Sequence, residues 1–228
     1  MFTRTCVRTR GIVTRMSVDF QASLFDTDTT TEPALGRLPG TVERHAMSHG
    51  AWVDVRRGWV TGADELFVRL VHEVPWYAER RQMYDRVVDV PRLLKFYGAD
   101  DPLPDALLAE ARDALSAYYL PELGEPFTTA GLCYYRDGRD SVAWHGDTIG
   151  RSRTDDTMVA IVSFGEDRRL LLRPREGGAG ATLGFSVGHG DLLVMGGSCQ
   201  RTWEHAVPKT AKPVGPRVSV QFRPHNVR

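Results

Sequence analysis

The sequence predicts an α+β fold in which a jelly-roll core of short strands follows an N-terminal region with helices. The chain has 228 residues, 42% hydrophobic and 25% charged, which suits one domain with a substrate-binding elaboration. Two helical patterns precede residue 127, and strand patterns fill the rest. Many short strands between glycine-rich turns are typical of a closed or double-sheet β-architecture.

Composition divides the chain into three segments. Residues 1–45 carry runs of threonine, aspartate and proline and are expected to be mostly irregular. Residues 46–126 are expected to form a helical region with a substrate-binding lid, and residues 127–228 the jelly-roll core. The basic start has no apolar stretch typical of a secretory signal, and either Met1 or Met16 could be the true start.

Two helices and a hairpin are predicted before the core. A helix is expected from Thr61 to about His72, because a capping residue and an acidic first turn precede apolar side chains at helical spacing. A second helix is expected over about 104–119 from the same spacing. Between them, residues 76–92 mix aromatic residues with arginines, and we expect a hairpin or ribbon there.

The strands of the core are predicted where apolar residues alternate, or run continuously, between turn residues. The glycine-rich stretch 176–180 is one such turn. Strands are expected at 130–136, 142–147, 157–164, 168–174, 181–187, 190–195, 201–207 and 216–223.

Charge and cysteine usage exclude several classes of protein. The net charge is zero, so nucleic-acid binding would have to rely on a local basic patch. The three cysteines form no CxxC pair, which favours a reducing, cytoplasmic setting and argues against a disulfide framework. No apolar run approaches the length of a membrane span. We expect a monomer.

Three residues in the second half are candidate metal ligands. His145 and Asp147 are two positions apart, so on a strand their side chains share a face. His205 lies on a different predicted strand and could supply a third ligand. Two histidines and one carboxylate with open positions form the facial triad of non-haem Fe(II) oxygenases. Each piece alone has an ordinary alternative, such as a histidine with a hydrogen-bond partner in a turn.

Two arginines complete the pattern. Arg217 and Arg223 are six positions apart, an even number, so on one strand they share a face. Two guanidinium groups on one face suit a dicarboxylate, because each can bind a carboxylate through two hydrogen bonds. Alone, the pair would more often be a solvated face. The order HxD, distant His and paired arginines is much more specific.

These motifs resemble those of the AlkB-like dioxygenases, which use Fe(II) and 2-oxoglutarate to remove alkyl groups from nucleic-acid bases. The resemblance covers roughly residues 60–225 and implies a double-stranded β-helix. Its motifs are Tyr134-Tyr135-Arg-Asp-Gly138 leading into His145-Gly-Asp147, then Ile161-Val-Ser-Phe-Gly165, His189-Gly190-Asp191, His205-Ala-Val-Pro208, Arg217-x4-Phe222-Arg223 and, upstream, Pro91-Arg92 and Tyr97-Gly98.

The resemblance implies a role for each residue. The triad would hold Fe(II), leaving positions for 2-oxoglutarate and O2. Arg217 and Tyr135 would bind the far carboxylate of 2-oxoglutarate, and Arg223 would lie at the metal end. Position 133, where the family usually has asparagine, is Cys133, a poorer hydrogen-bond donor.

The implied substrate is alkylated DNA or RNA, with the target base flipped or single-stranded. The residues predicted to contact it are Trp76, Tyr77, Tyr84, Arg92 and Tyr97. Aromatic residues after a helix are as often core anchors. The stretch after Asp147 lacks the acidic residues frequent in the family, so the substrate class stays open at this point.

Three alternatives remain from the sequence. The first is a 2-oxoglutarate oxygenase acting on a small molecule or a protein. The second is a non-catalytic jelly-roll binding module, which the complete set of ligands and arginines disfavours. The third is a zinc hydrolase, which would not need the arginine pair.

Overall fold

The structure is a computed structural model that describes residues 32–83, 86–175 and 181–227, with side chains outside 81–89. The chain divides into two compact units, Met1–Thr30 and Thr31–Arg228, and every described residue belongs to the second. The expectation of an irregular N-terminal segment therefore falls largely outside the described residues. No helix in the described part is both long and apolar enough to span a membrane.

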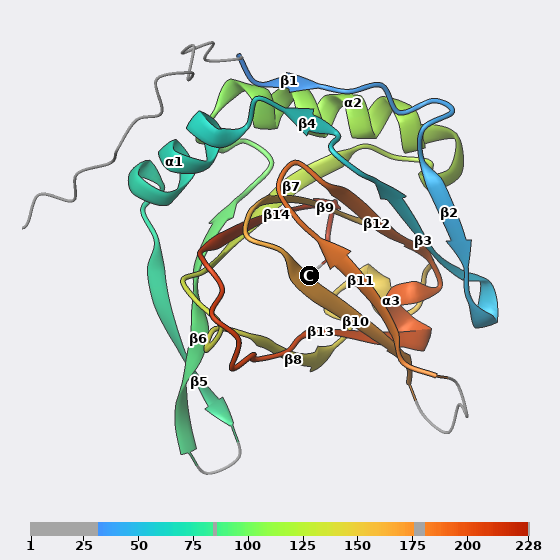
Figure 1. Cartoon of the computed structure of the whole chain (residues 1–228). Coiled ribbons are helices and arrows are strands. Elements are labelled where there is room, and N and C mark those ends of the chain that lie inside the picture. Colours follow the sequence, from blue (N-terminus) through green and yellow to red (C-terminus); the bar gives the residue numbers. More distant parts are fainter. Residues whose placement is uncertain (1–31, 84–85, 176–180, 228) are drawn as a thin grey trace, which may run out of the picture. The chain divides into compact units, whose positions relative to one another are not determined.

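The larger sheet has eight antiparallel strands in the order β2-β3-β12-β9-β14-β7-β6-β5 (Figure 1). Hydrogen-bonded register links its central strands over most of their length, with β14 pairing both β7 and β9. The strands are β2 Glu43–Ala46, β3 Ala51–Arg56, β5 Tyr77–Met83, β6 Arg86–Tyr97, β7 Phe127–Tyr135, β9 Val159–Gly165, β12 Leu192–Gly197 and β14 Arg217–Pro224.

The smaller sheet has four antiparallel strands in the order β11-β10-β13-β8. Its strands are β8 Val142–His145, β10 Arg168–Pro174, β11 Leu183–Val187 and β13 Trp203–Val207. A separate ribbon pairs β1 Ala34–Leu35 with β4 Val60–Thr61. Two antiparallel sheets packed in this way are the arrangement expected of a jelly roll.

Two apolar cores lie on the two faces of the larger sheet. One core joins inward side chains of both sheets, such as Val53, Ile161 and Leu172. The other joins the opposite face of the larger sheet to residues of α1 and α2, among them Leu66 and Leu115. The helices therefore cover one face of the larger sheet, and the smaller sheet covers the other.

Two of the three helices in the described chain, α1 and α2, lie close to the predicted positions, and the short α3 was not predicted. The helices are α1 Asp64–Glu73, α2 Ala106–Leu123 and α3 Cys199–Thr202, with 3-10 turns η1 Ser48–Gly50 and η2 Arg151–Arg153. The Asp105 side chain caps α2 by accepting the Leu107 N–H at 3.0 Å. Gly124, with φ of 78°, ends α2 in the left-handed conformation, which glycine adopts without steric cost. The helix predicted at 104–119 thus runs four residues further, past Pro121.

Strands β2 and β3 were not anticipated from the sequence. They extend the larger sheet beyond β12, inside the segment expected to be irregular or helical. The pattern of β3 is obscured by Asp54, a charged residue in an otherwise apolar run. Asp54 is buried because Arg44 binds both its carboxylate oxygens, at 2.7 and 2.9 Å, and the Tyr119 hydroxyl donates to it at 2.9 Å. A buried charge with this many partners is tolerated within a strand.

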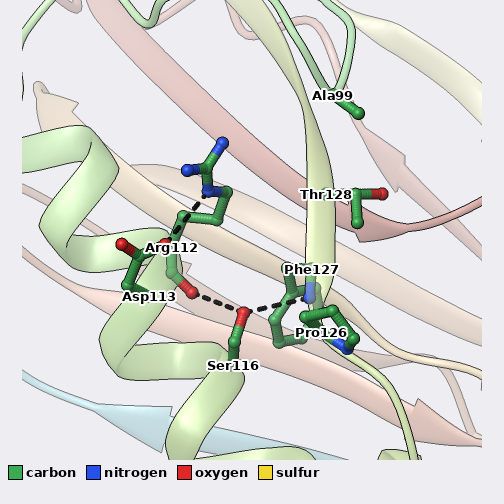
Figure 2. Close-up of a pocket in the computed structure, with 7 residues that line it drawn as sticks. All are labelled: Ala99, Arg112, Asp113, Ser116, Pro126, Phe127 and Thr128. Atoms are coloured by element: carbon green, nitrogen blue, oxygen red, sulfur yellow. Dashed lines mark hydrogen bonds and ion pairs between the residues drawn. The ribbon is translucent and has the colours of Figure 1, made fainter.

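One pocket lies on the helix-covered side, between α2 and the start of β7 (Figure 2). Within it, Ser116 Oγ donates to the carbonyl of Arg112 and accepts the Phe127 N–H at 3.0 Å. These bonds join the helix to the strand, so the pocket's polar groups serve the packing of α2. None of the candidate metal ligands lines it.

Candidate metal centre

The three side chains predicted to bind a metal lie together in the structure. His145 ends β8 and faces His205 of β13 directly across the strand pair, and Asp147 follows just beyond the end of β8. One ligand atom from each residue lies within 4.8 Å of the others. The two imidazole ring centroids are 4.2 Å apart. This donor set can hold a divalent transition metal and leave coordination positions open.

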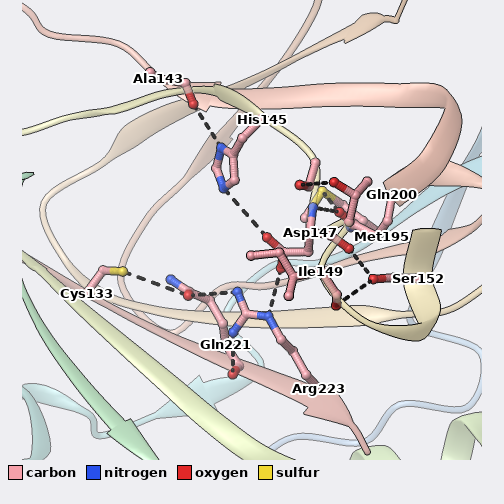
Figure 3. Close-up of polar contacts among 12 residues, drawn as sticks. Cys133, Ala143, His145, Asp147, Ile149, Ser152, Met195, Gln200, Gln221 and Arg223 are labelled. Atoms are coloured by element: carbon pink, nitrogen blue, oxygen red, sulfur yellow. Dashed lines mark hydrogen bonds and ion pairs between the residues drawn. The ribbon is translucent and has the colours of Figure 1, made fainter. Parts of the chain in front are cut away.

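The backbone fixes which nitrogen of His145 faces the other ligands. Its Nδ1 lies 2.8 Å from the Ala143 carbonyl oxygen (Figure 3), so Nδ1–H donates there and Nε2 carries the lone pair. Burial, and then the neighbouring His145, lower the pKa of His205 to about 3. His205 is therefore neutral near pH 7, and its lone pair is available to a metal.

Asp147 is buried and held as a carboxylate. Burial alone would raise the pKa of Asp147, but Arg223 and then the two histidines lower it well below its usual range. Arg223 Nε donates to Asp147 Oδ2 at 2.7 Å, a charge-assisted hydrogen bond. The other oxygen, Oδ1, lies toward Nε2 of His145. The carboxylate thus offers one oxygen to the arginine and one to the metal position.

The backbone of Asp147 is held by residues that the sequence did not indicate. Gln200 of α3, only 1% exposed, accepts the Asp147 N–H at 3.0 Å through Oε1. Ser152 Oγ donates to the Asp147 carbonyl. A Cβ at Gly146 would lie 2.4 Å from the Gln200 carbonyl oxygen, so only glycine fits between the two ligands. Gln200 lies far from Asp147 in the sequence, so no local motif predicts its contact with Asp147.

Arg217 has the features of a buried anion site. It is 3% exposed, and its Nε donates to Ser163 Oγ at 2.8 Å. Its Nη1 is buried and finds no hydrogen-bond partner among the described residues. A buried cationic donor without a partner is costly. A carboxylate group would satisfy it, which fits the predicted binding of 2-oxoglutarate.

Tyr135 lies opposite Arg217 in the β14–β7 register. The Arg217 guanidinium carbon is 5.3 Å from the centroid of its ring. Burial, and then the adjacent Cys133, raise the pKa of Tyr135 to about 12. The hydroxyl therefore stays protonated near neutral pH and can donate to an anion. Cys133 lies two residues before Tyr135, buried in the core between the sheets.

Tyr77 and Arg92, two of the predicted substrate contacts, lie on the paired strands β5 and β6, and their contact with a substrate stays a prediction. Tyr77 is 47% exposed and pairs with Leu94, a residue packed on the core between the sheets. Arg92 Nη1 donates to the Ser141 carbonyl at 3.0 Å, and its buried Nε lacks a partner within the described chain. Tyr84 lies outside the described residues.

The structure corrects the expectation for Tyr97 and favours the alternative for Trp76. Tyr97 is buried in the core beneath the helices, on the face of the larger sheet opposite the triad. Tyr97 and Arg92 are an odd number of positions apart on β6, so their side chains point to opposite faces. Trp76 packs against that same core and donates through Nε1 to carbonyls of α1 at 3.1 and 3.2 Å, as a core anchor does.

Comparisons with known proteins agree with this geometry. Residues 97–223 match the family model described as the 2OG-Fe(II) oxygenase superfamily. The chain is 29% identical to bovine alpha-ketoglutarate-dependent dioxygenase alkB homolog 3 over 178 residues, covering 71% of this chain and 61% of the relative. It is 28% identical to human DNA oxidative demethylase ALKBH2 over 182 residues, covering 71% and 68%.

A solved structure supports the fold. The structure of OsALKBH1 superposes with a TM-score of 0.56 at 13% identity, covering 80% of this chain and 100% of that one. At this identity the likeness concerns the fold alone. The chain spans about three fifths of the length of the bovine relative, since the match covers 61% of it.

Proposed function

Because the chain belongs to the 2OG-Fe(II) oxygenase superfamily, we propose that it is an Fe(II)- and 2-oxoglutarate-dependent dioxygenase that oxidatively removes alkyl groups from nucleic-acid bases. DNA alkylation repair is the proposed role. The observation that carries the proposal is the triad of His145, Asp147 and His205 beside a buried arginine with an unpartnered donor. Relatives named as DNA oxidative demethylases support the substrate class.

The residues of this chain have distinct tasks in such a reaction. Fe(II) and 2-oxoglutarate, when bound, supply with O2 the oxidation of the alkyl carbon. His145, Asp147 and His205 would hold the iron, and Arg217 with Tyr135 would bind the far carboxylate of 2-oxoglutarate. Arg223 keeps Asp147 ionised and oriented. The protein thus contributes ligand geometry, charge and positioning.

The β5–β6 hairpin is the proposed nucleic-acid-facing lid. It projects from the edge of the larger sheet (Figure 1), carries the exposed Tyr77, and is rich in arginine from residue 80 to 92. Arginines suit phosphates, and an exposed aromatic ring can stack on a base. A base in a duplex must leave the stack to reach a buried metal site. The hairpin would therefore contact the strand around the flipped base.

A substrate panel tests the proposal. Purified protein with Fe(II) and 2-oxoglutarate would be incubated with methylated DNA or RNA oligonucleotides, their unmethylated counterparts, or a mixture of small metabolites and peptides. Succinate formation is the readout. The proposal expects stimulation by methylated oligonucleotides. Stimulation by a small molecule or peptide alone would instead favour the alternative oxygenase that acts on such substrates.

We also propose a cellular compartment and an oligomeric state. Cysteines without CxxC spacing support a reducing, cytoplasmic setting. Of these, Cys133 and Cys199 are buried and free. We also propose a monomer, because both sheets bury their inner faces within one chain. Size-exclusion chromatography with light scattering would test the oligomeric state.

A further inference from the structure

A row of polar side chains on the inner face of β14 joins the two predicted arginines. Residues 217, 219, 221 and 223 share that face, which makes the row Arg217, Ser219, Gln221 and Arg223. Across the strand pair lie Tyr135, Cys133, Gly131 and Thr129, in the same order. The row therefore has a cation at each end and neutral polar groups between.

Gln221 fills the middle of this row. Its Oε1 accepts from Arg223 Nη2 at 3.3 Å and lies 3.8 Å from Cys133 Sγ, as Figure 3 shows. Its Nε2 donates to Ser219 Oγ at 2.9 Å. An amide nitrogen carries two protons, and Nε2 makes only this one hydrogen bond among the described residues. One donor is thus left over between the two arginines.

The small residues around Gln221 are what allow it to lie there. Gly131, directly opposite, has no side chain, and a Cβ added to it would lie 2.9 Å from Arg223 Nη1 and 3.5 Å from Gln221 Oε1. Cys133 and Ser219 face each other and are also small. A long carboxamide can therefore reach across from β14 over β7. Position 133 itself offers only a weak thiol donor.

We propose that Gln221 supplies the carboxamide donor for 2-oxoglutarate that position 133 lacks, and that Gly131, Cys133 and Ser219 are small to make room for it. Gln221 would also position Arg223, whose Nη1 donates to the Gln221 carbonyl at 3.4 Å and whose Nη2 donates to its side chain. The inference rests on the proposed use of 2-oxoglutarate and assigns part of its binding to a residue outside the arginine pair.

The test compares 2-oxoglutarate binding in four variants loaded with Mn(II) under air-free conditions. Gln221→Leu keeps the size but removes the amide. It is expected to weaken 2-oxoglutarate binding about tenfold or more, because a hydrogen bond to a charged group is lost. Combining Cys133→Asn with Gln221→Ala, which frees the space that Gln221 fills, should give binding close to wild type, since the carboxamide returns from the facing strand. Thr128→Val, on the opposite face of β7, is the matched control and should bind like wild type.

The fourth variant and two further measurements distinguish a local effect on 2-oxoglutarate binding from a general loss of folding. Gln221→Glu keeps the shape but replaces the donor with an acidic group and should weaken binding further. Mn(II) affinity and thermal unfolding should stay close to wild type in Gln221→Leu, because the Arg223 Nε bond to Asp147 remains. Binding of 2-oxoglutarate by Gln221→Leu as tight as wild type, or binding by the Gln221→Ala, Cys133→Asn double variant as weak as that of Gln221→Leu, would overturn the inference.

Binding of 2-oxoglutarate by wild type, Arg217→Ala and Gln221→Leu tests the proposed function and the role of Gln221 separately. If wild-type protein with Mn(II) binds no 2-oxoglutarate, the proposed function fails and the inference fails with it. If wild type binds and Arg217→Ala does not, the cosubstrate site stands. A Gln221→Leu variant that still binds normally would then contradict only the role of Gln221.

Discussion

At the scale of single residues, Asp147 shows how one carboxylate is fixed for metal binding. Its Oδ2 is bound by Arg223, its N–H by Gln200 and its carbonyl by Ser152. These partners come from a strand, a short helix and a 3-10 turn. Because each is separately placed by the fold, the side chain has little freedom to rotate away from the two histidines. A preorganised ligand of this kind is what metal affinity requires.

Replacing Asp147 with alanine should abolish activity while the fold persists. Metal affinity should fall at least about a hundredfold, since the loss of an outer contact alone typically costs about 10- to 100-fold. Equilibrium dialysis with Mn(II), succinate formation and circular dichroism would check this. Asp155→Ala, at an exposed position close by, is the control. Unchanged metal binding in Asp147→Ala would show that the triad does not hold the ion.

Replacing Arg217 with alanine should raise the 2-oxoglutarate concentration needed for half-maximal turnover by more than tenfold. The loss of a charged hydrogen-bonded pair in a buried site typically costs about 2–5 kcal/mol. Steady-state kinetics with varied 2-oxoglutarate would measure it. The exposed Arg169→Ala serves as a control. An unaltered requirement would mean that Arg217 has only a structural role.

At the scale of elements, the two faces of β6 pack against different cores. Tyr97 points into the core beneath the helices, and Leu94 lies against the core between the sheets. Strand alternation alone predicts this division once the strand's extent is known. The sequence predicted a hairpin near 76–92 but not that β6 continues to Tyr97. Without that continuity, Tyr97 could not be assigned to a face.

Tyr77 on β5 should contribute to oligonucleotide binding if the hairpin is the lid. Base stacking on an aromatic ring is worth roughly 1–3 kcal/mol, so Tyr77→Ala should weaken binding of a methylated single strand by about five- to 150-fold. Fluorescence anisotropy against labelled oligonucleotides would measure it. Val68→Ala removes another exposed apolar side chain, from α1, and should have no effect. Equal loss in both variants would contradict a specific role for the hairpin.

Asp54 links strand β3 to Arg44 of β2 and Tyr119 of α2. Asp54→Ala removes the partner of the Tyr119 hydroxyl, which is buried, and of Arg44, which is partly exposed. Leaving a buried donor unsatisfied costs about 1–3 kcal/mol, and we expect the free energy of unfolding to fall by that amount. Urea denaturation would show it. Tyr119→Phe removes the donor instead of its acceptor, and should cost less. A stability equal to wild type in Asp54→Ala would contradict the structural role of this network.

At the scale of the whole molecule, the sequence predicted what depends on periodicity. Eight strands from residue 127 onward, the α1 and α2 regions, and the shared face of His145 and Asp147 follow from alternation and helical spacing. The third ligand, His205, was predicted from the order of the motifs, because two histidines and one carboxylate form a facial triad. What the sequence missed depends on contacts between distant segments. Gln200 of α3 binds the backbone of Asp147. In β3, the charged residue Asp54 interrupts the apolar run that would predict a buried strand, and its burial depends on Arg44 and Tyr119. Neither set of contacts has a local sequence pattern.

The candidate metal ligands and the residues predicted to bind 2-oxoglutarate come from both sheets. The smaller sheet supplies two histidines, and the larger sheet supplies Arg217, Arg223 and Tyr135. Helices α1 and α2 pack on the opposite face of the larger sheet, whereas Gln200 of α3 contacts Asp147. We therefore propose that one site couples 2-oxoglutarate consumption to the oxidation of an alkylated base.

The most direct test measures succinate and formaldehyde in the same reaction with a methylated oligonucleotide. Each dealkylation event should release one aldehyde as one 2-oxoglutarate is consumed. We therefore predict that succinate and formaldehyde accumulate together in wild type. Neither should accumulate in Asp147→Ala. Succinate formed at the same rate with and without the methylated oligonucleotide, and no formaldehyde, would contradict the claim that this site acts on alkylated nucleic acid.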